Sequence, residues 1–296
     1  MGRNQGQVKP THNMDSKART LYVSDLDGTL LNTSSAVSPR SRELLNRAIA
    51  DGALFTVATA RTPATVSTLL DGIHMTLPAV VMTGAALWDS ATGIYTDIHG
   101  IPAGTVRRMV KIYRDCGTPT FIYRLVDGKI EIYHYGEMSE TERQFLAERL
   151  DNPYKHFESL DCQADGVPNC MDDVVLFYAM QPDDKARAAY ERIKALPVTP
   201  LCYHDIFGPE TSIVEVFGPQ TTKANAVRRL ARSIGAERIV SFGDNVNDLP
   251  LMEIADMAVA VGNAVPEARQ AADVVIDAND TDAVARFILD DMNRQR

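Results

Sequence analysis

The sequence has few cysteines: four among 296 residues, and no two of them form a Cys-x-x-Cys pair. A disulfide framework and a zinc knuckle are therefore not expected, and reduced cysteines fit a cytoplasmic protein. No uninterrupted apolar run reaches the ~18 residues that a membrane span needs, and the polar N-terminus lacks the apolar stretch of a signal peptide. We therefore expect a cytoplasmic protein with no place in a membrane.

Basic residues are also fewer than acidic ones: the sequence has 30 Lys and Arg and 39 Asp and Glu, which gives a net charge of -9. Such a surface repels phosphate backbones and anionic lipids on average, so neither nucleic acid nor a membrane is an expected partner. Nothing in the sequence indicates an obligate protein partner. The composition is otherwise that of a folded globular chain, with 45% hydrophobic and 23% charged residues.

Short apolar runs alternate with amphipathic segments from residue 21 onward, which is typical of βα units around a mostly parallel sheet. The candidate strands are residues 21–25, 54–59, 79–83, 238–244, 257–261 and 274–276. Ser38 and Pro39 predict the start of a helix that Gly52 ends, and Thr222 predicts the start of another that ends before Gly235. The sequence therefore predicts the α/β fold class.

The pattern changes between about residues 87 and 217. Apolar runs at 120–125 and 129–135 flank Val126-Asp127-Gly128, which predicts a hairpin, and residues 174–180 predict a strand followed by a helix at 183–195. Because βα units occur on both sides of this mixed α+β region, we expect an inserted domain. The predicted division is a lead-in at 1–20, a core at 21–86 and 218–296, and the insert at 87–217.

Small, polar or acidic residues lie at the ends of the candidate strands. An Asp or Thr alone in such a place is most often a helix cap or a turn residue. In an open parallel sheet, however, ligands bind beyond the carboxyl ends of the strands, and five strand ends carry such residues here. These residues are Asp25, Thr59, Thr83 with Gly84, Gly243 with Asp244, and Gly262 with Asn263.

Two of these ends are rich in aspartate: Asp25-Leu26-Asp27-Gly28-Thr29 and Gly243-Asp244-Asn245-Val246-Asn247-Asp248. If their carboxylates converge, each pair at ~4 Å costs on the order of 4 kcal/mol at an effective dielectric of 20. A positive charge must then lie among them. Oxygen ligands without His or Cys select a hard cation, and Mg²⁺ with retained waters and a phosphate ligand suits them better than zinc.

The same residues could carry out a reaction. One carboxylate can attack phosphorus and form an aspartyl-phosphate, while a second carboxylic acid protonates the leaving oxygen and later activates water. Asp25 and Asp27 suit these two roles. Lys223 and the Thr59 hydroxyl would hold the phosphoryl oxygens.

At these motifs the sequence resembles the haloacid dehalogenase superfamily, in particular its Cof-type phosphatases of subfamily IIB, which carry a C2-type α/β cap. The first motif matches at residues 25–29, the second at Thr59, the third at Lys223 and the fourth at residues 243–248. Gly262-Asn263-Ala264 matches the C-terminal signature of the family. The resemblance covers most of the chain from Leu21 onward.

The resemblance implies a Rossmann-like core with the insert as a cap that roofs the site. Asp25 would be the nucleophile and Asp27 the general acid and base, with Thr59 and Lys223 as phosphate contacts. Mg²⁺ would be held by the Asp25 carboxylate, the Asp27 backbone carbonyl, Asp244, and Asp248 directly or through water. Asn247 would contact the phosphoryl group.

Two positions depart from the family pattern. Ala60 replaces a glycine of the second motif, and Thr83-Gly84 replaces the usual Asn-Gly, which leaves Gly84 to offer backbone amides to phosphate. Arg61 has two readings that remain open: a substrate or phosphate contact, or a cation paired with a nearby carboxylate.

Together these features predict a Mg²⁺-dependent phosphatase of a small phosphorylated metabolite. A sugar phosphate is the first substrate to consider, by analogy with capped relatives. Two alternatives stay open: a phosphomutase of the phosphomannomutase kind, and a non-catalytic sensor of a phosphorylated metabolite.

Overall fold

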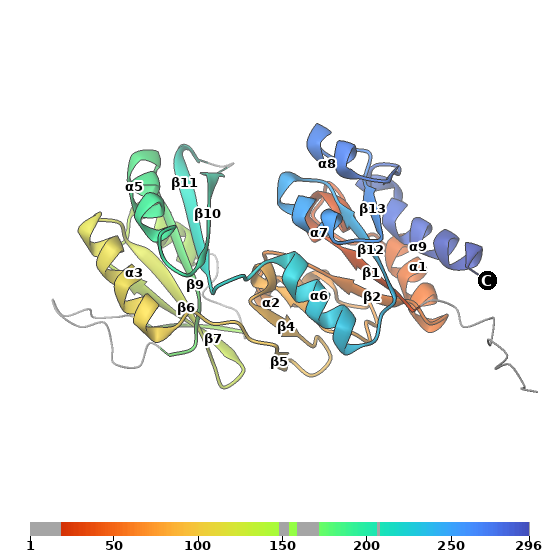
Figure 1. The fold of residues 1–296 in the computed structure, drawn as a ribbon, viewed down its shortest axis with the longest axis horizontal. Coiled ribbons are helices and arrows are strands. Elements are labelled where there is room, and N and C mark those ends of the chain that lie inside the picture. The colour runs from red at the N-terminus through yellow and green to blue at the C-terminus, as the bar shows by residue number, and fades with distance from the viewer. Residues whose placement is uncertain (1–18, 148–153, 159–171, 206–207, 296) are drawn as a thin grey trace, which may run out of the picture.

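The computed structural model describes residues 19–147, 154–158, 172–205 and 208–295, and it forms two lobes (Figure 1). Most of the predicted lead-in, residues 1–18, lies outside the described residues, as do Cys162 and Cys170. The described cysteines, Cys116 and Cys202, are free. Within the described residues, no helix combines the length and apolar character that crossing a membrane requires.

One lobe, the core, is built on a parallel sheet of five strands in the order β14-β13-β12-β1-β2. Its strands are β1 (Thr20–Ser24), β2 (Leu54–Val57), β12 (Arg238–Gly243), β13 (Met257–Ala260) and β14 (Val274–Val275). The predicted α/β class with a parallel core sheet is confirmed. Each strand ends one or two residues earlier than predicted, so the polar residues lie just beyond the strand ends.

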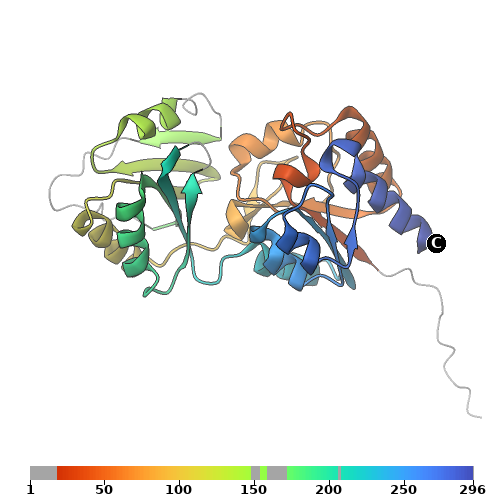
Figure 2. The same cartoon turned by 90° about the horizontal axis from the view of Figure 1, so that it is seen from above.

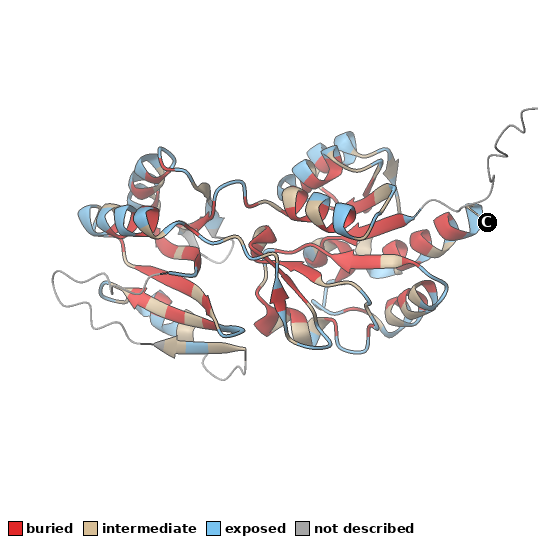
Figure 3. Ribbon diagram, turned by 60° about the horizontal axis from the view of Figure 1, so that its bottom comes forward, coloured by how far each residue is buried: buried red, intermediate tan, exposed pale blue. Residues whose placement is uncertain are grey.

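Helices cover both faces of the core sheet. They are α1 (Pro39–Ala50), α2 (Pro63–Leu69), α6 (Lys223–Ser233), α7 (Leu249–Glu253), α8 (Pro266–Ala271) and α9 (Ala283–Arg294). Along β1, Tyr22 packs in the cluster that includes residues of α1 and α9, whereas Leu21 and Val23 pack with residues of α6 and α7. The central strands are therefore apolar on both sides and buried (Figure 3).

Two predicted helix starts are confirmed by their caps. The Ser38 hydroxyl accepts a hydrogen bond from the Ser41 amide at 2.9 Å, with Pro39 as the first residue of α1. The Thr222 hydroxyl accepts one from the Asn225 amide at 3.1 Å and begins α6. Both caps satisfy amides that have no partner within the helix. The cap at Thr222 also makes Lys223 the first residue of α6.

The order of the core strands reverses between β1 and β12. From β1 the chain continues to β2 and then to β3 (Ala79–Val81), which joins β2 through a parallel bridge between Ala58 and Val80. On the other side of β1 lie β12, β13 and β14. Such a switch point leaves a crevice at the carboxyl ends of the two neighbouring strands. Asp25 and Asp244 directly follow these two strands.

The chain around the predicted start of the insert forms a three-stranded sheet. β4 (Ala86–Trp88) pairs antiparallel with β3, and β5 (Tyr95–Thr96) pairs antiparallel with β4, so this sheet extends to Thr96. The predicted boundary at residue 87 falls inside β4. Positive φ angles at Met82, Thr83 and Gly84 form the tight turn that sends the chain back. The last residue paired in this sheet is Thr96.

The other lobe, the cap, is built on a six-stranded sheet in the order β10-β11-β9-β6-β7-β8. Its elements are α3 (Ala103–Asp115), β6 (Thr120–Val126), β7 (Lys129–Tyr135), α4 (Glu140–Ala147), β8 (Lys155–Glu158), β9 (Val174–Pro182), α5 (Asp183–Ile193), β10 (Thr199–Asp205) and β11 (Gly208–Phe217). The hairpin of β6 and β7, the strand β9 and the helix α5 confirm the predicted elements. All pairs are antiparallel except β7 with β8.

Two chain segments connect the lobes (Figure 2). They pass so close together that a Cβ atom on Gly218 would lie 2.6 Å from the carbonyl oxygen of Gly100. Only glycine fits this contact without a shift of the backbone. The Ile101 amide then donates to the Val174 carbonyl at 2.7 Å and fixes the first segment to the cap sheet.

Candidate active site

Asp25 lies at the switch point, directly after β1, and is 5% exposed. Its amide continues the ladder to β12 by donating to the Phe242 carbonyl at 3.0 Å. Lys223, the first residue of α6, donates from Nζ to Asp25 Oδ1 at 2.6 Å and to Asp248 Oδ1 at 2.9 Å. One buried ammonium group thus holds two buried carboxylates together.

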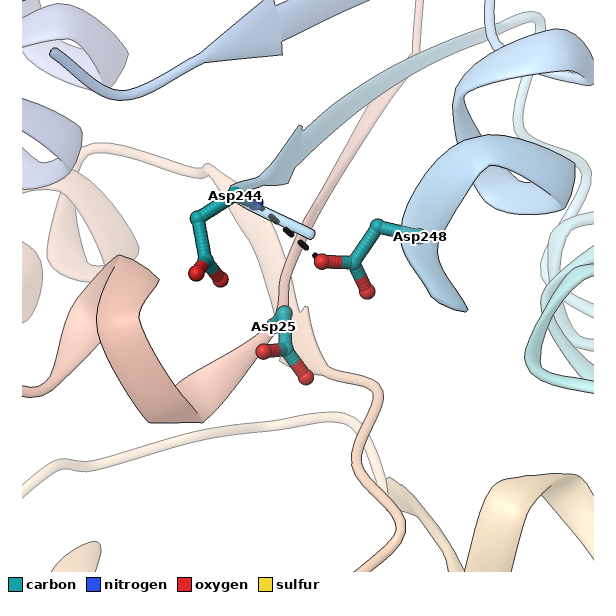
Figure 4. A group of neighbouring side chains, drawn as sticks. All are labelled: Asp25, Asp244 and Asp248. Carbon is teal, nitrogen blue, oxygen red and sulfur yellow. Dashed lines mark hydrogen bonds between the residues drawn. The ribbon is translucent and has the colours of Figure 1, made fainter. Parts of the chain in front are cut away.

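Asp244 and Asp248 complete a group of three carboxylates (Figure 4). Asp244 follows β12, and its Oδ1 accepts a hydrogen bond from the Thr29 hydroxyl at 2.8 Å. Asp248 belongs to the short turn η3 (Val246–Asp248), and its Oδ2 accepts from the amides of Asp244 and Asn245 at 3.1 and 3.2 Å. These bonds fix the orientation of both side chains.

Gly28 explains how the chain after β1 can approach this group. It has a φ of +75°, in the left-handed region, within the turn η1 (Leu26–Leu30). A Cβ atom at this position would lie 2.5 Å from Asp244 Oδ2. The glycine is therefore required both by the backbone conformation and by the close approach to Asp244.

Asp27 is half-exposed, and its carboxylate is held by Arg61 instead of joining the other three. Arg61 donates from Nε to Asp27 Oδ2 at 2.7 Å and from Nη2 to Asp27 Oδ1 at 2.6 Å, a bidentate pair. The Arg61 amide in turn donates to the Thr59 hydroxyl at 3.1 Å. Of the two open readings of Arg61, the structure shows the cation paired with a carboxylate.

Three further predicted residues lie at the same edge of the sheet. Thr59 is buried just after β2, and its amide and carbonyl bond to the backbone of Val80 and Thr83. Gly84 is buried, and a Cβ atom there would lie 2.4 Å from the Thr222 carbonyl oxygen, so close packing against the start of α6 requires glycine. Asn247 is exposed on η3.

Burial and the crowding of like charges shift the pKa values of the site. Burial raises the pKa of Asp25 to about 7, with the Lys223 ammonium opposing this shift and the Asp248 carboxylate adding to it. Burial also raises the pKa of Asp244 above its usual range. Burial alone would lower the pKa of Lys223, but Asp25 and Asp248 outweigh it and raise that pKa. Lys223 therefore stays charged.

The three carboxylates suit a hard divalent cation. Asp25, Asp244 and Asp248 each offer an oxygen, and these oxygens lie within 4.8 Å of one another. They are all oxygen ligands, and the Lys223 ammonium bonds to only two of the three carboxyl groups, so a further positive charge would be stabilised. The Asp27 side chain is bound to Arg61, so Asp27 could contribute only through its main chain.

Two contacts of the site go beyond the residues selected from the sequence. Thr29 belongs to the first aspartate motif, but only the fold shows that its hydroxyl bonds to Asp244. The bond of the Arg61 guanidinium to Asp27 joins residues 34 positions apart. The aspartate motif could have indicated Thr29, whereas no local signal in the sequence determines the partner of Arg61.

Comparisons with known proteins show to which family the chain is similar. A family model described as haloacid dehalogenase-like hydrolase matches residues 22–288. A 5-amino-6-(5-phospho-D-ribitylamino)uracil phosphatase of Bacillus subtilis is 27% identical over 289 residues, which cover 89% of this chain and 95% of that protein. A pyridoxal phosphate phosphatase of Escherichia coli is 24% identical over 273 residues, covering 89% and 95% of the two chains.

Solved structures show the same fold. A haloacid dehalogenase-like hydrolase from Bacteroides thetaiotaomicron aligns with a TM-score of 0.71 at 22% identity, over 92% of this chain and 98% of that chain. A subclass IIB sugar phosphatase of this superfamily aligns with a TM-score of 0.69 at 20% identity, over 92% and 99% of the chains. Both structural alignments cover the core and the cap.

Proposed function

Because the chain belongs to the haloacid dehalogenase-like hydrolases, in their Cof-type branch, we propose that it is a Mg²⁺-dependent phosphatase that acts through an aspartyl-phosphate on Asp25. The predicted family and the class of enzyme, a phosphoric monoester hydrolase, are confirmed. The observation that carries the proposed chemistry is the position of Asp25. It lies buried at the switch point, bound to Lys223 and adjacent to Asp244 and Asp248.

In the first half-reaction, a carboxylate oxygen of Asp25 attacks phosphorus, and the bond from phosphorus to the leaving oxygen breaks. Lys223 fixes the orientation of the Asp25 carboxylate through Oδ1 and offsets the charge that develops on the phosphoryl oxygens. The hydroxyl of Thr59, an amide of Gly84 and the side chain of Asn247 are the proposed further phosphate contacts.

Asp27 is the proposed general acid and base. It donates its proton to the leaving oxygen, then takes a proton from the water that attacks phosphorus and breaks the bond to Asp25. Asp25 is buried among charges, whereas the Asp27 side chain is 52% exposed at the edge of the site. Two carboxylates in such different surroundings are suited to different roles. Arg61 must release the Asp27 carboxylate before that carboxylate can carry a proton.

Mg²⁺ is the proposed cation, held by the carboxylates of Asp25, Asp244 and Asp248 and by the Asp27 backbone carbonyl. When bound, it would stabilise negative charge on the phosphoryl group and bring the phosphate close to carboxylates that would otherwise repel it. The protein with a net charge of -9 thereby becomes able to bind a phosphoester.

The proposed substrate is a small phosphorylated metabolite, with a sugar phosphate first. The relatives support this class: one is named for a phosphoribitylamino-uracil, another for pyridoxal phosphate, and a structural neighbour for sugar phosphates. All three names describe phosphate on a small polar molecule.

The test is phosphate release from a panel that contains hexose phosphates, pentose phosphates, the phosphoribitylamino-uracil and pyridoxal phosphate, with and without Mg²⁺. We expect turnover that requires the cation and favours one group of substrates. A requirement for a sugar bisphosphate activator, with isomer formation in place of phosphate release, would instead identify a phosphomutase. Binding without turnover of any member would identify a sensor.

A further inference from the structure

Asn263 lies in the loop that follows β13. Its Nδ2 donates to the carbonyl oxygen of Gly28 at 2.7 Å, although the two residues are 235 positions apart. Its Oδ1 accepts from the amide of Asn279 at 2.9 Å. A single side-chain amide thus joins the loop after β13 to the turn that contains Asp27 and Gly28.

The same loop also contacts the second aspartate motif. The amide of Val265, two residues after Asn263, donates to the carbonyl oxygen of Asp244 at 2.8 Å. The loop after β13 therefore contacts the backbone of both motifs, once through a side chain and once through the main chain. Only the contact through Asn263 can be removed by changing a side chain.

Asn279 continues this chain of bonds to the other end of the turn. While its amide bonds to Asn263, its Nδ2 donates to the carbonyl oxygen of Leu31 at 2.8 Å. Asn263 and Asn279 together hold η1 at Gly28 and at Leu31. Between these two points lies Thr29, whose hydroxyl bonds to Asp244.

We propose that Asn263 is a positioning residue, which holds the Gly28 carbonyl and so fixes the Asp27–Gly28 turn against Asp244. The physical reason is the close contact at Gly28, where the Cα lies so near Asp244 that no Cβ would fit. A small movement of the turn therefore displaces the Asp27 carbonyl, the Asp244 carboxylate, or both. Residues that orient ligands in this way typically change affinity or activity by about 10–100-fold when they are removed.

The chain offers a matched control in Asn46. Its Nδ2 donates to the Gly72 carbonyl at 2.8 Å, and its Oδ1 accepts from the His74 amide at 2.8 Å. Asn46 on α1 thus makes the same two kinds of bond as Asn263, but between segments that carry none of the proposed site residues. Asn263→Ala and Asn46→Ala each remove one donated and one accepted side-chain hydrogen bond, but only Asn263→Ala does so beside the proposed site.

The experiment compares wild type with these two variants in three measurements. Mn²⁺, which takes the same oxygen ligands as Mg²⁺, is titrated into substrate-free protein, and free ion is counted by electron paramagnetic resonance. Turnover of p-nitrophenyl phosphate with Mg²⁺ gives kcat and KM, and urea unfolding without metal gives stability. We expect Asn263→Ala to weaken Mn²⁺ binding and lower kcat about tenfold each, with KM changed far less. Asn46→Ala should bind Mn²⁺ and turn over like wild type.

The inference rests on the proposed function. Measurements on the wild type distinguish a failure of the proposed function from a failure of the inference. If wild type neither binds Mn²⁺ nor releases phosphate, the proposed function fails. If wild type does both and Asn263→Ala matches Asn46→Ala in binding and in kcat, the role of Asn263 is refuted. Equal losses of stability in both variants with no difference in kcat would also refute it. Should Asn263→Ala not fold, Asn263→Ser, which is too short to reach Gly28, takes its place with the same expectation.

Discussion

The two sheets place their buried polar groups differently. In the core, one group of buried charges lies at the carboxyl ends of the strands, where Lys223 bonds to Asp25 and Asp248 across elements far apart in sequence. In the cap, the buried carboxylate of Glu142 bonds to Ser139 and Gln181 and lies near His134, all within the cap itself. This core group forms the candidate site, whereas the Glu142 carboxylate holds elements of the cap together.

This difference separates two kinds of mutation. Asn substitutions at the proposed catalytic aspartates should remove turnover and leave the fold, whereas substitutions at buried polar groups of the cap should reduce stability and leave the chemistry. Removal of Lys223, the buried cation of the core site, should reduce stability as well. The predictions below run from the largest expected effect to the smallest and test this separation.

Asp25→Asn should lower turnover by at least about a thousandfold, because an amide cannot replace the carboxylate nucleophile. The fold should persist, since the substitution keeps the size of the side chain and removes one of three crowded carboxyl groups. Phosphate release and thermal unfolding measure the two effects. Activity near that of wild type would refute Asp25 as the nucleophile.

Asp27→Asn should slow hydrolysis of esters with poor leaving groups by about 10²–10⁴-fold, because the leaving oxygen is no longer protonated. Phosphorylation of the enzyme by p-nitrophenyl phosphate needs little protonation and should be affected much less. The measurement is the first-turnover rate for a series of leaving groups. An equal loss for good and poor leaving groups would contradict the role as acid.

Lys223→Met should lower the free energy of unfolding by about 3–5 kcal/mol without metal, because Asp25 and Asp248 would lose their buried cation. Added Mg²⁺ should restore part of this stability by placing another positive charge between the carboxylates. Urea unfolding with and without the ion measures both effects. Stability equal to that of wild type in metal-free solution would show that the pairing contributes nothing.

Glu142→Gln is the matching test in the cap. Burial by itself raises the pKa of Glu142, but bonds from His134 and Ser139 outweigh it and lower that pKa. The unfolded chain then binds the proton more readily, so the stability contributed by Glu142 is present near neutral pH and is lost as the pH falls below about 4.5, the ordinary pKa of the group.

The variant should lose about 1–3 kcal/mol of stability at neutral pH and show a weaker decline on acidification. Its turnover of p-nitrophenyl phosphate should stay within about twofold of wild type, because none of the residues proposed for the reaction is affected. Urea unfolding at several pH values checks the first effect. A large loss of turnover in a folded, stable variant would contradict the separation between the lobes.

The core site was largely predictable because its residues follow short apolar strands within local motifs. Parallel strands end at the same edge of the sheet, so Asp25, Asp244 and Asp248 had to meet once β1 and β12 were neighbours. The helix cap at Thr222 likewise predicted that Lys223 begins α6. In each case, the sequence signal, a strand end or a helix cap, lies within a few residues of the side chain that it positions.

What the sequence did not reveal depends on contacts between distant segments. The pairing of Arg61 with Asp27 depends on the side-chain conformations of both residues, which the spacing of the two residues in the sequence does not determine. The return of β4 onto β3 depends on positive φ at Met82 and Thr83, residue types that rarely adopt it. A change in composition therefore could not reveal this return of the chain.

The most direct test of Asp25 as the phosphorylated residue uses the Asp27→Asn variant, in which loss of the base should slow hydrolysis of the phosphoenzyme. The variant is mixed with p-nitrophenyl phosphate and Mg²⁺, quenched in acid, and mapped by peptide mass spectrometry. We expect a stoichiometric burst of p-nitrophenolate and one phosphoryl group on the peptide that contains Asp25, at Asp25 itself. A burst with the phosphoryl group on another residue, or with none on the protein, would contradict the proposed mechanism.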